Sequence, residues 1–494
     1  MRAVEDEFRA PAGRRPIIRA GALLRRPGAG ARLTRLLPSA ALLVAAALLV
    51  AAPPDDHFGL LIAVVPFLAA AVHGAQATAV IGALSVAVFA ALRMWRTEDE
   101  PGVAVIKLGL VSAAGAVAVL ISQARSRERR LNRATDIALA LQEGLLPRAI
   151  PRSSAVDVCH RYGPTDAEAG VGGDWFDVIR LSGARVALVM GDVVGHGVHA
   201  AATMGRLRTA VRTLADLDLA PDELLARMDD LTEQLDEDDT NGLGATCLYL
   251  VYDPISRVCT LASAGHTPPA LLRPDGSVEF PQLAEHPPLG IGGTPFAATE
   301  LTLDEGTVIA LYTDGLLDLR HRGTDAALAA VAGVLTSPTA SLQQLCDRVY
   351  DQAPADSDDD VAVMLARVKS VPDGSVATWD LPADPRSAGT ARSAAAAQLA
   401  GWGLEAAGFT TELVVSELVT NAVRHATGPI TLRLIRDDAL ICEVSDGSST
   451  APHMRLPRLT DEGGRGLYLV GRLADRWGTR YTGTGKTIWV EQAV

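Results

Sequence analysis

The motif Gly172-Gly173-Asp174-Trp175-Phe176-Asp177 opens a series of four short acidic motifs that decides the fold of the middle of this chain. The others, in order, are Gly191-Asp192-Val193-Val194-Gly195-His196-Gly197, Thr313-Asp314-Gly315 and Asp358-Asp359-Asp360. The last three lie beside apolar, strand-like runs. Because strand ends are rigid, we expect these carboxylates to be held close together, where they repel one another unless a hard divalent cation such as Mg²⁺ or Mn²⁺ neutralises them. The motifs therefore predict a metal-dependent hydrolytic centre.

The composition indicates several domains of unlike character. A single hydrophobic core rarely grows beyond about 250–300 residues, and this chain has 494. Residues 37–123 are almost free of charge, and the rest resembles ordinary soluble protein. The formal net charge of −13 argues against a general nucleic-acid binder. The five cysteines are scattered without a Cys-x-x-Cys pair, which predicts neither a zinc site nor disulfides and favours the cytosol for the soluble part.

Three apolar blocks precede the acidic motifs, at 36–52, 58–94 and 102–123. A helix needs about 20 apolar residues to cross a bilayer, so the middle block is long enough for two and the prediction is four spans. Arginines flank the region on both sides, which places both flanks in the cytoplasm. We predict an Arg-rich cytoplasmic leader at 1–35, a membrane region at 36–123, and a multi-pass protein of the cell membrane with cytoplasmic catalytic domains.

Residues 124–149 are rich in helix formers and are predicted to be a connecting helix. Its apolar residues recur at alternating spacings of three and four, at Leu131, Ala134, Ala138, Leu141 and Leu145. This spacing is typical of a short coiled-coil seam and predicts a parallel homodimer. A helix that packs on its own domain would show the same spacing, so both interpretations stay open.

Residues 150–369 have the pattern of an α+β domain. Strands are predicted at 185–190, 245–252, 257–263, 308–312 and 361–368, and helices at 198–216, 221–235, 324–335 and 339–352. A lone Gly-Asp after a strand usually marks a turn. Four acidic motifs in order, each at a strand edge of one domain-sized segment, favour a catalytic site instead.

These motifs resemble the protein phosphatase 2C (PPM) family, specifically the bacterial SpoIIE/RsbU-type serine/threonine phosphatases. Further support comes from Ser263-Ala264-Gly265-His266 and Pro288-Leu289-Gly290, which resemble the mid-domain signature of that family, and from Leu141-Gln142 through Pro147, which resembles its entry helix. The resemblance covers about 130–369. It implies a central β-sandwich flanked by helices and the activity of a metal-dependent protein phosphatase.

By this resemblance, two Mn²⁺ or Mg²⁺ ions would be held by Asp174, Asp192, Asp314 and Asp359. Asp192 would bridge the two ions, and the Val193 carbonyl would be a further ligand. A water activated by the ions would attack the phosphorus of a phosphoserine or phosphothreonine in line.

The sequence departs from the family pattern at Ala362, where a threonine is common. It also leaves open which of the three consecutive aspartates at 358–360 binds metal. His196 and His266 are interpreted as structural histidines.

A linker is predicted at 370–379 and a further domain at 380–494, with helices at 384–400 and 410–426. Glu417 and Asn421 are four residues apart and so share one helix face. Asp446-Gly447 follows a predicted strand at 439–445. Gly463-Gly464-Arg465-Gly466 opens a helix, which suits phosphate binding, and Gly485-Lys486-Thr487 precedes the last strand.

In this order the motifs resemble the Bergerat (GHKL) ATP-binding fold, an α/β sandwich, and most closely the anti-sigma-factor serine kinases. The resemblance implies that Asn421 holds Mg²⁺ on the phosphates of ATP, that Glu417 acts as catalytic base, and that Asp446 accepts from the adenine amino group. Gly464, Gly466 and Thr487 would line the nucleotide. The usual Asp-x-Gly-x-Gly is reduced to Asp446-Gly447-Ser448-Ser449, so a domain that only binds nucleotide or a sigma factor stays open beside a kinase.

Together the two resemblances predict a membrane-anchored protein phosphatase with an appended kinase-like domain. Its substrate would be a phosphorylated anti-anti-sigma-type protein, and a sigma factor is a further candidate partner. A sensor histidine kinase also carries a Bergerat domain behind membrane helices, but it needs a phosphoacceptor histidine and 124–148 has none. A non-enzymatic scaffold in which both sites have decayed conflicts with the complete set of acids in the phosphatase domain, whereas the altered Asp446 loop leaves this alternative open for the kinase-like domain.

Overall fold

The computed structural model describes residues 29–51, 57–96, 101–145, 151, 153–163, 172–195, 197–238, 244–293, 295–317, 323–336, 341–354, 359–425, 428–450 and 466–494. The chain divides into two compact units, Met1–Arg133 and Ala134–Val494.

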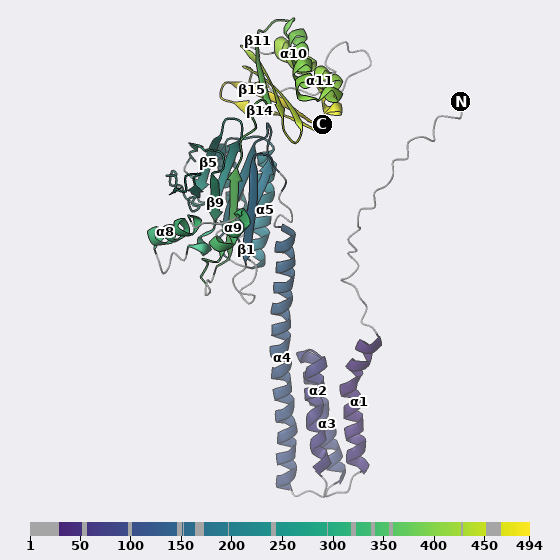
Figure 1. Ribbon diagram of the computed structural model, residues 1–494. Helices are drawn as coiled ribbons and strands as arrows, with labels where there is room; N and C mark the ends of the chain where they lie inside the picture. The colour runs from purple at the N-terminus through teal and green to yellow at the C-terminus, as the bar shows by residue number, and fades with distance from the viewer. Residues whose placement is uncertain are drawn as a thin grey trace, which may run out of the picture. The chain divides into compact units, whose positions relative to one another are not determined.

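The first unit is helical (Figure 1). Its elements are α1 (Ala29–Ala51), η2 (His57–Val64), α2 (Val65–Val72), α3 (Ala75–Arg96) and the first part of α4 (Pro101–Leu145). A small cluster of Ala45, Ile62, Phe89 and Val111 forms the centre of the unit. Helices α3 and α4 touch where Gly82 faces Gly115: a Cβ built on Gly82 would lie 3.6 Å from the Cα of Gly115. Small residues of this kind let two helix backbones approach closely.

Within the part of the chain that the structure describes, two helices are long and apolar enough to cross a membrane, over Ala75–Leu92 and Gly102–Arg129. Two other apolar helical segments, Leu36–Leu48 and Leu61–Val72, are shorter. All four predicted spans are therefore helical where the structure describes them, but length and composition support two of the four.

The predicted last span and connecting helix form one continuous helix, the 45-residue α4. The side chains of the predicted coiled-coil seam lie outside the described residues. Dimerisation through that seam stays a prediction.

The described residues of the first domain in the second unit form two antiparallel sheets of five strands each. Its strands are β1 (Val156–Gly163), β2 (Trp175–Arg180), β3 (Val186–Val193), β4 (Ala245–Asp253), β5 (Val258–Ala264), β6 (Ala270–Leu272), β7 (Val278–Glu279), β8 (Thr299–Thr302), β9 (Val308–Tyr312) and β10 (Val361–Val368). The β1 sheet has the order β1-β10-β9-β6-β7, and the β2 sheet has the order β2-β3-β4-β5-β8.

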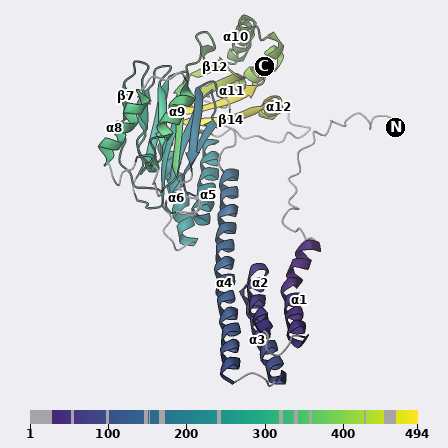
Figure 2. The same cartoon turned by 60° about the horizontal axis from the view of Figure 1, so that its bottom comes forward.

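The two sheets pack face to face between two pairs of helices. Apolar residues of both sheets, among them Phe176, Leu188 and Met364, fill the space between them. Helices α5 (Val198–Ala215) and α6 (Pro221–Asp238) cover the β2 sheet, and α8 (Thr324–Leu335) and α9 (Leu342–Tyr350) cover the β1 sheet (Figure 2). The expected β-sandwich flanked by helices is confirmed.

This layering explains why the predicted strands are continuous apolar runs instead of alternating ones. A strand with a sheet on one side and helices on the other is buried on both faces. Residues 186–190 of β3 are all fully buried, and so are 362–366 of β10.

Pairing of the strands brings the acidic motifs to one end of the sandwich. Asp174 immediately precedes β2, whose antiparallel neighbour β3 ends at Val193, one residue past Asp192. In the other sheet β9 ends before Asp314, and its antiparallel neighbour β10 begins after Asp360. Each sheet thus contributes two strand ends to a common edge.

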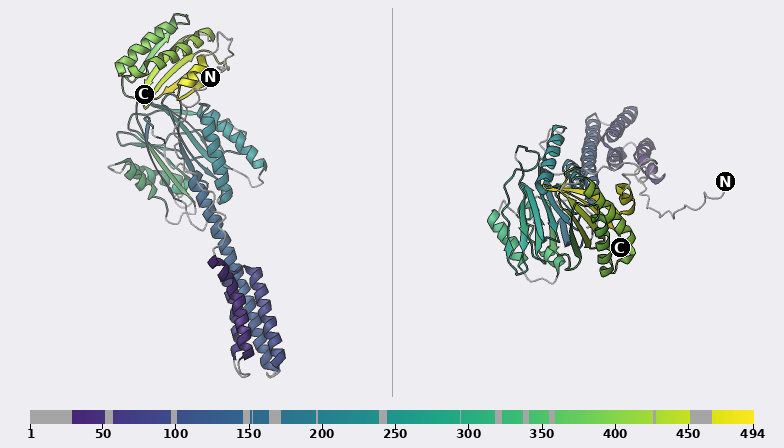
Figure 3. Two further views of the ribbon diagram at one scale, coloured as in Figure 1. Left: turned by 90° about the vertical axis from the view of Figure 1, so that its right-hand side faces the viewer. Right: turned by 90° about the horizontal axis from the view of Figure 1, so that it is seen from above.

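The C-terminal domain has a single antiparallel sheet of the order β11-β12-β13-β15-β14. Its elements are β11 (Val376–Leu381), α10 (Ser387–Trp402), η4 (Glu405–Ala407), α11 (Gly408–His425), β12 (Ile430–Arg436), β13 (Leu440–Asp446), α12 (Gly466–Leu473), β14 (Arg476–Thr482) and β15 (Gly485–Gln492). The helices cover one face of the sheet, as Figure 3 shows for the green helices above the yellow strands. The predicted linker at 370–379 needs correction, because its second half belongs to β11, which pairs with β12.

A buried ion pair fastens α5 to the β2 sheet. Asp177 of β2 is fully buried; its carboxylate accepts from Arg212 Nη2 at 2.7 Å and lies 3.0 Å from Arg208 Nε. The backbone N–H of Val178 donates to the same carboxylate at 2.9 Å. These bonds satisfy a charge that burial would otherwise penalise.

We expect Asp177→Ala to lower the free energy of unfolding by about 2 kcal/mol, because two arginines lose a charged partner inside the domain. Urea unfolding measures this change. The matched control is Asp230→Ala, since Asp230 is 64% exposed and 3.9 Å from Arg227, and it should change stability by less than about 0.5 kcal/mol. Equal effects of the two substitutions would contradict the assigned role.

Candidate functional sites

The first site is the acidic end of the β-sandwich, and Asp174 is its most buried member. Oδ2 of Asp174 accepts from Thr313 Oγ1 at 2.7 Å, whereas Oδ1 is buried and has no hydrogen-bond partner among the described residues. Burial, followed by the charge of Asp192, raises the pKa of Asp174 well above its usual range.

Asp192 is half-buried at the end of β3. Its pKa is raised from 3.8 to about 7, mainly by burial and in addition by the charges of Asp314 and Asp359. Four acids from distant motifs therefore interact electrostatically. The structure brings Asp174, Asp192, Asp314 and Asp359 together as predicted by the motifs.

The glycine of the first motif allows the strand ends to approach. A Cβ on Gly173 would lie 2.2 Å from the Val193 carbonyl oxygen and 2.9 Å from Asp192 Oδ1. Any side chain there would displace both groups. The Val193 carbonyl, the predicted backbone ligand, thus lies beside the Asp192 carboxylate.

The three consecutive aspartates differ in their surroundings. Asp358 lies outside the described residues. Asp360 is buried, accepts from the Tyr162 hydroxyl at 2.9 Å, and lies so close to Gly172 that a Cβ there would be 0.9 Å from its Oδ2. Asp359 is exposed, and its charge, like that of Asp360, acts on both Asp174 and Asp192. Asp359 as the metal ligand therefore stays a prediction.

Sequence reasoning missed the roles of two hydroxyl groups. Thr313 Oγ1 donates to Asp174 and accepts from the Ala362 N–H at 2.9 Å, so it ties β10 to the site. Thr313 stood in a quoted motif, and its position next to Asp314 was the available signal. Tyr162 lies in β1, far along the chain from every acidic motif, and no pattern in the sequence marks it.

The donor set fits a hydrated divalent cation. Among the described residues no three Asp, Glu, His or Cys side chains form a ready-made coordination sphere. Mg²⁺, however, usually keeps several waters and takes only one or two carboxylates directly. The unpartnered Oδ1 of Asp174 and the mutual repulsion of the four acids are the features that a cation would relieve.

His266 is buried beside the β2 sheet. Nδ1 lies 2.8 Å from Thr246 Oγ1, and burial lowers the pKa of His266 to about 4, so the ring is neutral. The structural role expected of it stays a prediction. His196 lies outside the described residues.

The second site lies in the C-terminal domain. Glu417 and Asn421 lie one turn apart on α11. The Glu417 carboxylate contacts the start of α12, because a Cβ on Gly466 would lie 2.2 Å from its Oε2. Gly464 lies outside the described residues.

Asp446 is buried and already paired. Oδ1 accepts from Lys486 Nζ at 2.8 Å and from the Ser448 N–H at 2.8 Å, and the Asp446 and Lys486 side chains are 2% and 3% exposed. Thr487 instead bonds to Ser445 at 2.8 Å, on the opposite face of the sheet. The structure therefore brings Lys486 to Asp446 and does not bring Thr487 there.

Comparisons with known proteins agree with both domains. Residues 182–369 match the family model for stage II sporulation protein E (SpoIIE), and residues 381–491 match that for a histidine kinase-like ATPase domain. Phosphoserine phosphatase RsbP of Bacillus subtilis (strain 168) is 26% identical over 155 residues, 31% of this chain and 38% of RsbP. Phosphoserine phosphatase RsbU of the same strain is 23% identical over 197 residues, 40% of this chain and 57% of RsbU. The chain thus spans less than two thirds of either relative.

Among solved structures, the RsbU and RsbW domains of Rv1364c from Mycobacterium tuberculosis are 26% identical to this chain with a TM-score of 0.41. The match covers 70% of this chain and 95% of that one.

The acidic motifs, the sandwich that gathers them and the match at 182–369 agree, as do the motifs and the match at 381–491. The chain therefore carries a SpoIIE-type phosphatase domain of the PPM family, followed by a histidine kinase-like ATPase domain.

Proposed function

We propose that this chain is a membrane-anchored, metal-dependent protein serine/threonine phosphatase with an appended ATP-binding domain. The observation that carries the proposal is the convergence of Asp174, Asp192, Asp314 and Asp359 from both sheets at one edge of the sandwich. The relatives RsbP and RsbU, which are named phosphoserine phosphatases, support the same reaction.

Asp174, Asp192, Asp314, Asp359 and the Val193 carbonyl would hold two Mn²⁺ or Mg²⁺ ions, which supply an activated water and neutralise phosphoryl charge when bound. The protein contributes position and charge. Thr313 fixes one oxygen of Asp174 by a hydrogen bond, and the other oxygen is buried without a partner among the described residues, so it is available to a cation.

The substrate class follows from the combination of domains. A phosphatase and a serine kinase-like domain on one chain would act on opposite sides of a protein phosphorylation equilibrium. We infer a phosphorylated anti-anti-sigma-type protein as substrate and a sigma factor as a further partner. A candidate phosphoprotein that loses phosphate only with Mn²⁺, and regains it only with ATP, would establish both activities.

For the C-terminal domain, ATP with Mg²⁺ is the proposed ligand. Glu417 as base and Asn421 as Mg²⁺ ligand lie on one helix, and the Glu417 carboxylate lies beside Gly466. The alternative is a regulatory module that binds nucleotide without turnover, or one that only holds a sigma factor. Because Lys486 already donates to Oδ1 of Asp446, an adenine amino group would have to share this carboxylate, which would weaken nucleotide binding.

Membrane anchoring rests on the surface of the first unit. Large apolar side chains point outward there: Leu43 is 73% exposed, Val105 69% and Leu120 63%. Patches of this kind on a soluble protein would favour aggregation, whereas lipid would cover them. We place this unit in the cell membrane with the catalytic domains in the cytoplasm, and propose a homodimer through α4.

We expect Asp192→Asn to abolish metal-dependent release of phosphate from a phosphoserine protein, a loss of at least about 100-fold. The measurement is phosphate release with and without Mn²⁺. The matched control is Asp157→Asn, whose side chain is 56% exposed and bonds to surface Lys369, and it should keep its activity. Full activity of Asp192→Asn would contradict the assignment of a two-metal site.

Mn²⁺ affinity should rise about tenfold from pH 6 to pH 8. The cation binds the ionised carboxylate, and the pKa of Asp192 is raised to about 7, so protons compete with the metal below that pH. For the same reason the metal-free protein should lose stability as the pH rises from about 4 through about 7, since the folded state holds this proton more tightly than the unfolded state. Calorimetric titration with Mn²⁺ tests the first expectation, and an affinity independent of pH would refute it.

Asn421→Ala should weaken binding of Mg²⁺–ATP at least about tenfold, because the phosphates lose their cation ligand. Equilibrium binding of a fluorescent ATP analogue to the full chain measures this. Gln398→Ala, an amide on neighbouring α10, is the control and should bind normally. An unchanged affinity in Asn421→Ala would count against the nucleotide site.

A further inference from the structure

Among the described residues, helices cover one face of the ATPase-domain sheet, where Val444 and Ile488 pack. The face without helices, here called the open face, is also buried. Side chains alternate along a strand, so Glu443 and Trp489 lie on the other face, and they are nevertheless only 1% and 7% exposed. A charged side chain is almost never so buried unless it is paired. Some other part of the chain must cover this face.

The covering segment is the turn between β2 and β3 of the phosphatase domain. A Cβ on Gly183 in this turn would lie 2.6 Å from Glu443 Oε1. Arg480 of β14 donates to Ser182 Oγ at 3.0 Å and also lies 3.4 Å from Glu443. The turn thus sits on the two charged residues at the centre of the sheet face.

These contacts belong to a network of alternating charge that crosses from one domain to the other. Glu443 accepts from Arg433 Nε at 2.7 Å on the ATPase side. Ser182 Oγ donates to Asp218, which accepts from Arg185 at 2.7 Å on the phosphatase side. A separate contact joins Ser154 Oγ to Asp437 at 2.6 Å. Since the charges at its centre are paired and largely removed from water, breaking a link should cost more than it would at a surface.

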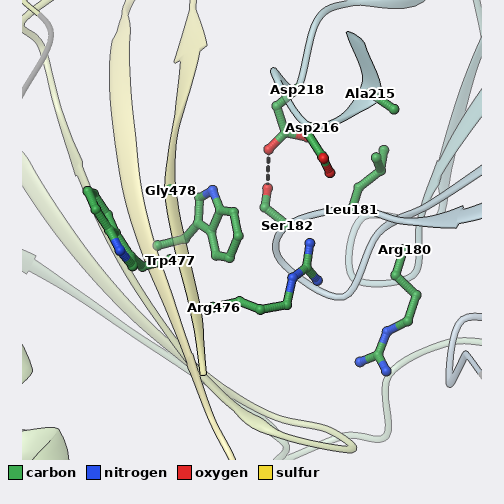
Figure 4. A pocket seen from close by; sticks show the side chains of 10 residues that line it. Arg180, Leu181, Ser182, Ala215, Asp216, Asp218, Arg476, Trp477 and Gly478 are labelled. Atoms are coloured by element: carbon green, nitrogen blue, oxygen red, sulfur yellow. Dashed lines mark hydrogen bonds between the residues drawn. The ribbon is translucent and has the colours of Figure 1, made fainter. Parts of the chain in front are cut away.

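The contact leaves a cavity of about 420 Å³ beside the network. Figure 4 shows Arg476 and Trp477 of the ATPase domain on one wall and Arg180, Leu181 and Ser182 of the phosphatase domain on the other, with the bond between Ser182 and Asp218 dashed. The two domains therefore meet around a gap and not through a continuous apolar core. A joint of this kind, held by polar contacts, can shift without unfolding either domain.

The strands at this joint also lead to both candidate sites. Glu443 lies on β13, which ends at Asp446, and Arg480 pairs across β14–β15 with Thr487, next to Lys486. On the other side, β2 and β3 run from the turn to Asp174 and Asp192. A change at either site that moves these strands would reach the joint.

We propose that the open face of the ATPase-domain sheet is a docking surface for the phosphatase domain of the same chain, and that Arg480 and Glu443 link the nucleotide site to the β2–β3 turn. The docking part stands on the contacts alone. The link to nucleotide rests on the proposed ATP site.

Hydrogen exchange of the full chain in detergent, read by mass spectrometry, tests the docking surface. Arg480→Glu should speed exchange in residues 181–185 at least about tenfold, because the turn loses its cover. The control is Arg472→Glu on exposed α12, which should leave the turn unchanged. Protection of β12 and β13 from exchange in the same spectra reports whether the ATPase domain is folded. Glu443→Gln is a second, milder variant that weakens the same contact. If the exchange rate of residues 181–185 is unchanged both in folded Arg480→Glu and in Glu443→Gln, the proposal is overturned.

The link is tested by adding a non-hydrolysable ATP analogue with Mg²⁺ to the same samples. Exchange at 181–185 should change in the wild-type chain and stay constant in Arg480→Glu. Binding of the analogue, measured in parallel by fluorescence, separates the possible failures. If the analogue binds but exchange at residues 181–185 does not change, the link alone is overturned. Absent binding overturns both the nucleotide site and the link, and the docking surface is then judged by the first measurement.

Discussion

The repulsion between carboxylates at the end of the sandwich is the constraint on which the active site of this chain depends. Burial and neighbouring charge both raise the pKa values of Asp174 and Asp192, so the folded protein holds these groups together against their electrostatics. Such a cluster persists only on a rigid frame. The frame here is two antiparallel sheets packed through an apolar layer and backed by helices on both sides.

Other features of the domain serve the same constraint. Gly172 and Gly173 remove the side chains that would keep the strand ends apart. Tyr162 and Thr313 each give a hydroxyl to one of the acids, which fixes its orientation without adding charge. Asp177, by contrast, carries a fully paired charge three residues from Asp174 and holds α5 in place. Asp174, just before β2, and Asp177, within it, therefore have different roles. Asp177 is neutralised by arginines and stabilises the packing of α5, whereas Asp174 has no such cation partner among the described residues.

The sequence predicted most of the fold because its longest strands are buried on both faces and therefore stand out as apolar runs. Strands β3, β4, β5, β9 and β10 lie where they were expected. Strands β6, β7 and β8 were missed because they have three, two and four residues. Strand β1 was missed because it carries Asp157, His160 and Arg161 among its apolar residues.

The sites were predicted less completely because they depend on long-range register. Three identical aspartates at 358–360 cannot be told apart by type, and only the packing of Asp360 against Gly172 distinguishes them. Likewise, Lys486 and Thr487 are neighbours, but the pairing of Thr487 with Ser445 decides that Lys486 shares a face with Asp446. Spacing along the chain does not contain this information.

The division of the acidic cluster between two sheets has a mechanical consequence. Asp174 and Asp192 move with one layer of the sandwich, and Asp314 and Asp359 move with the other. The layers are joined by the apolar core between them and, at the acidic end, by the hydrogen bond from Thr313 to Asp174. The distances between charges across the seam are therefore set by how the two sheets pack and not by either strand pairing alone. A substitution in the core far from the acids that shifts one sheet against the other would alter metal affinity without touching a ligand.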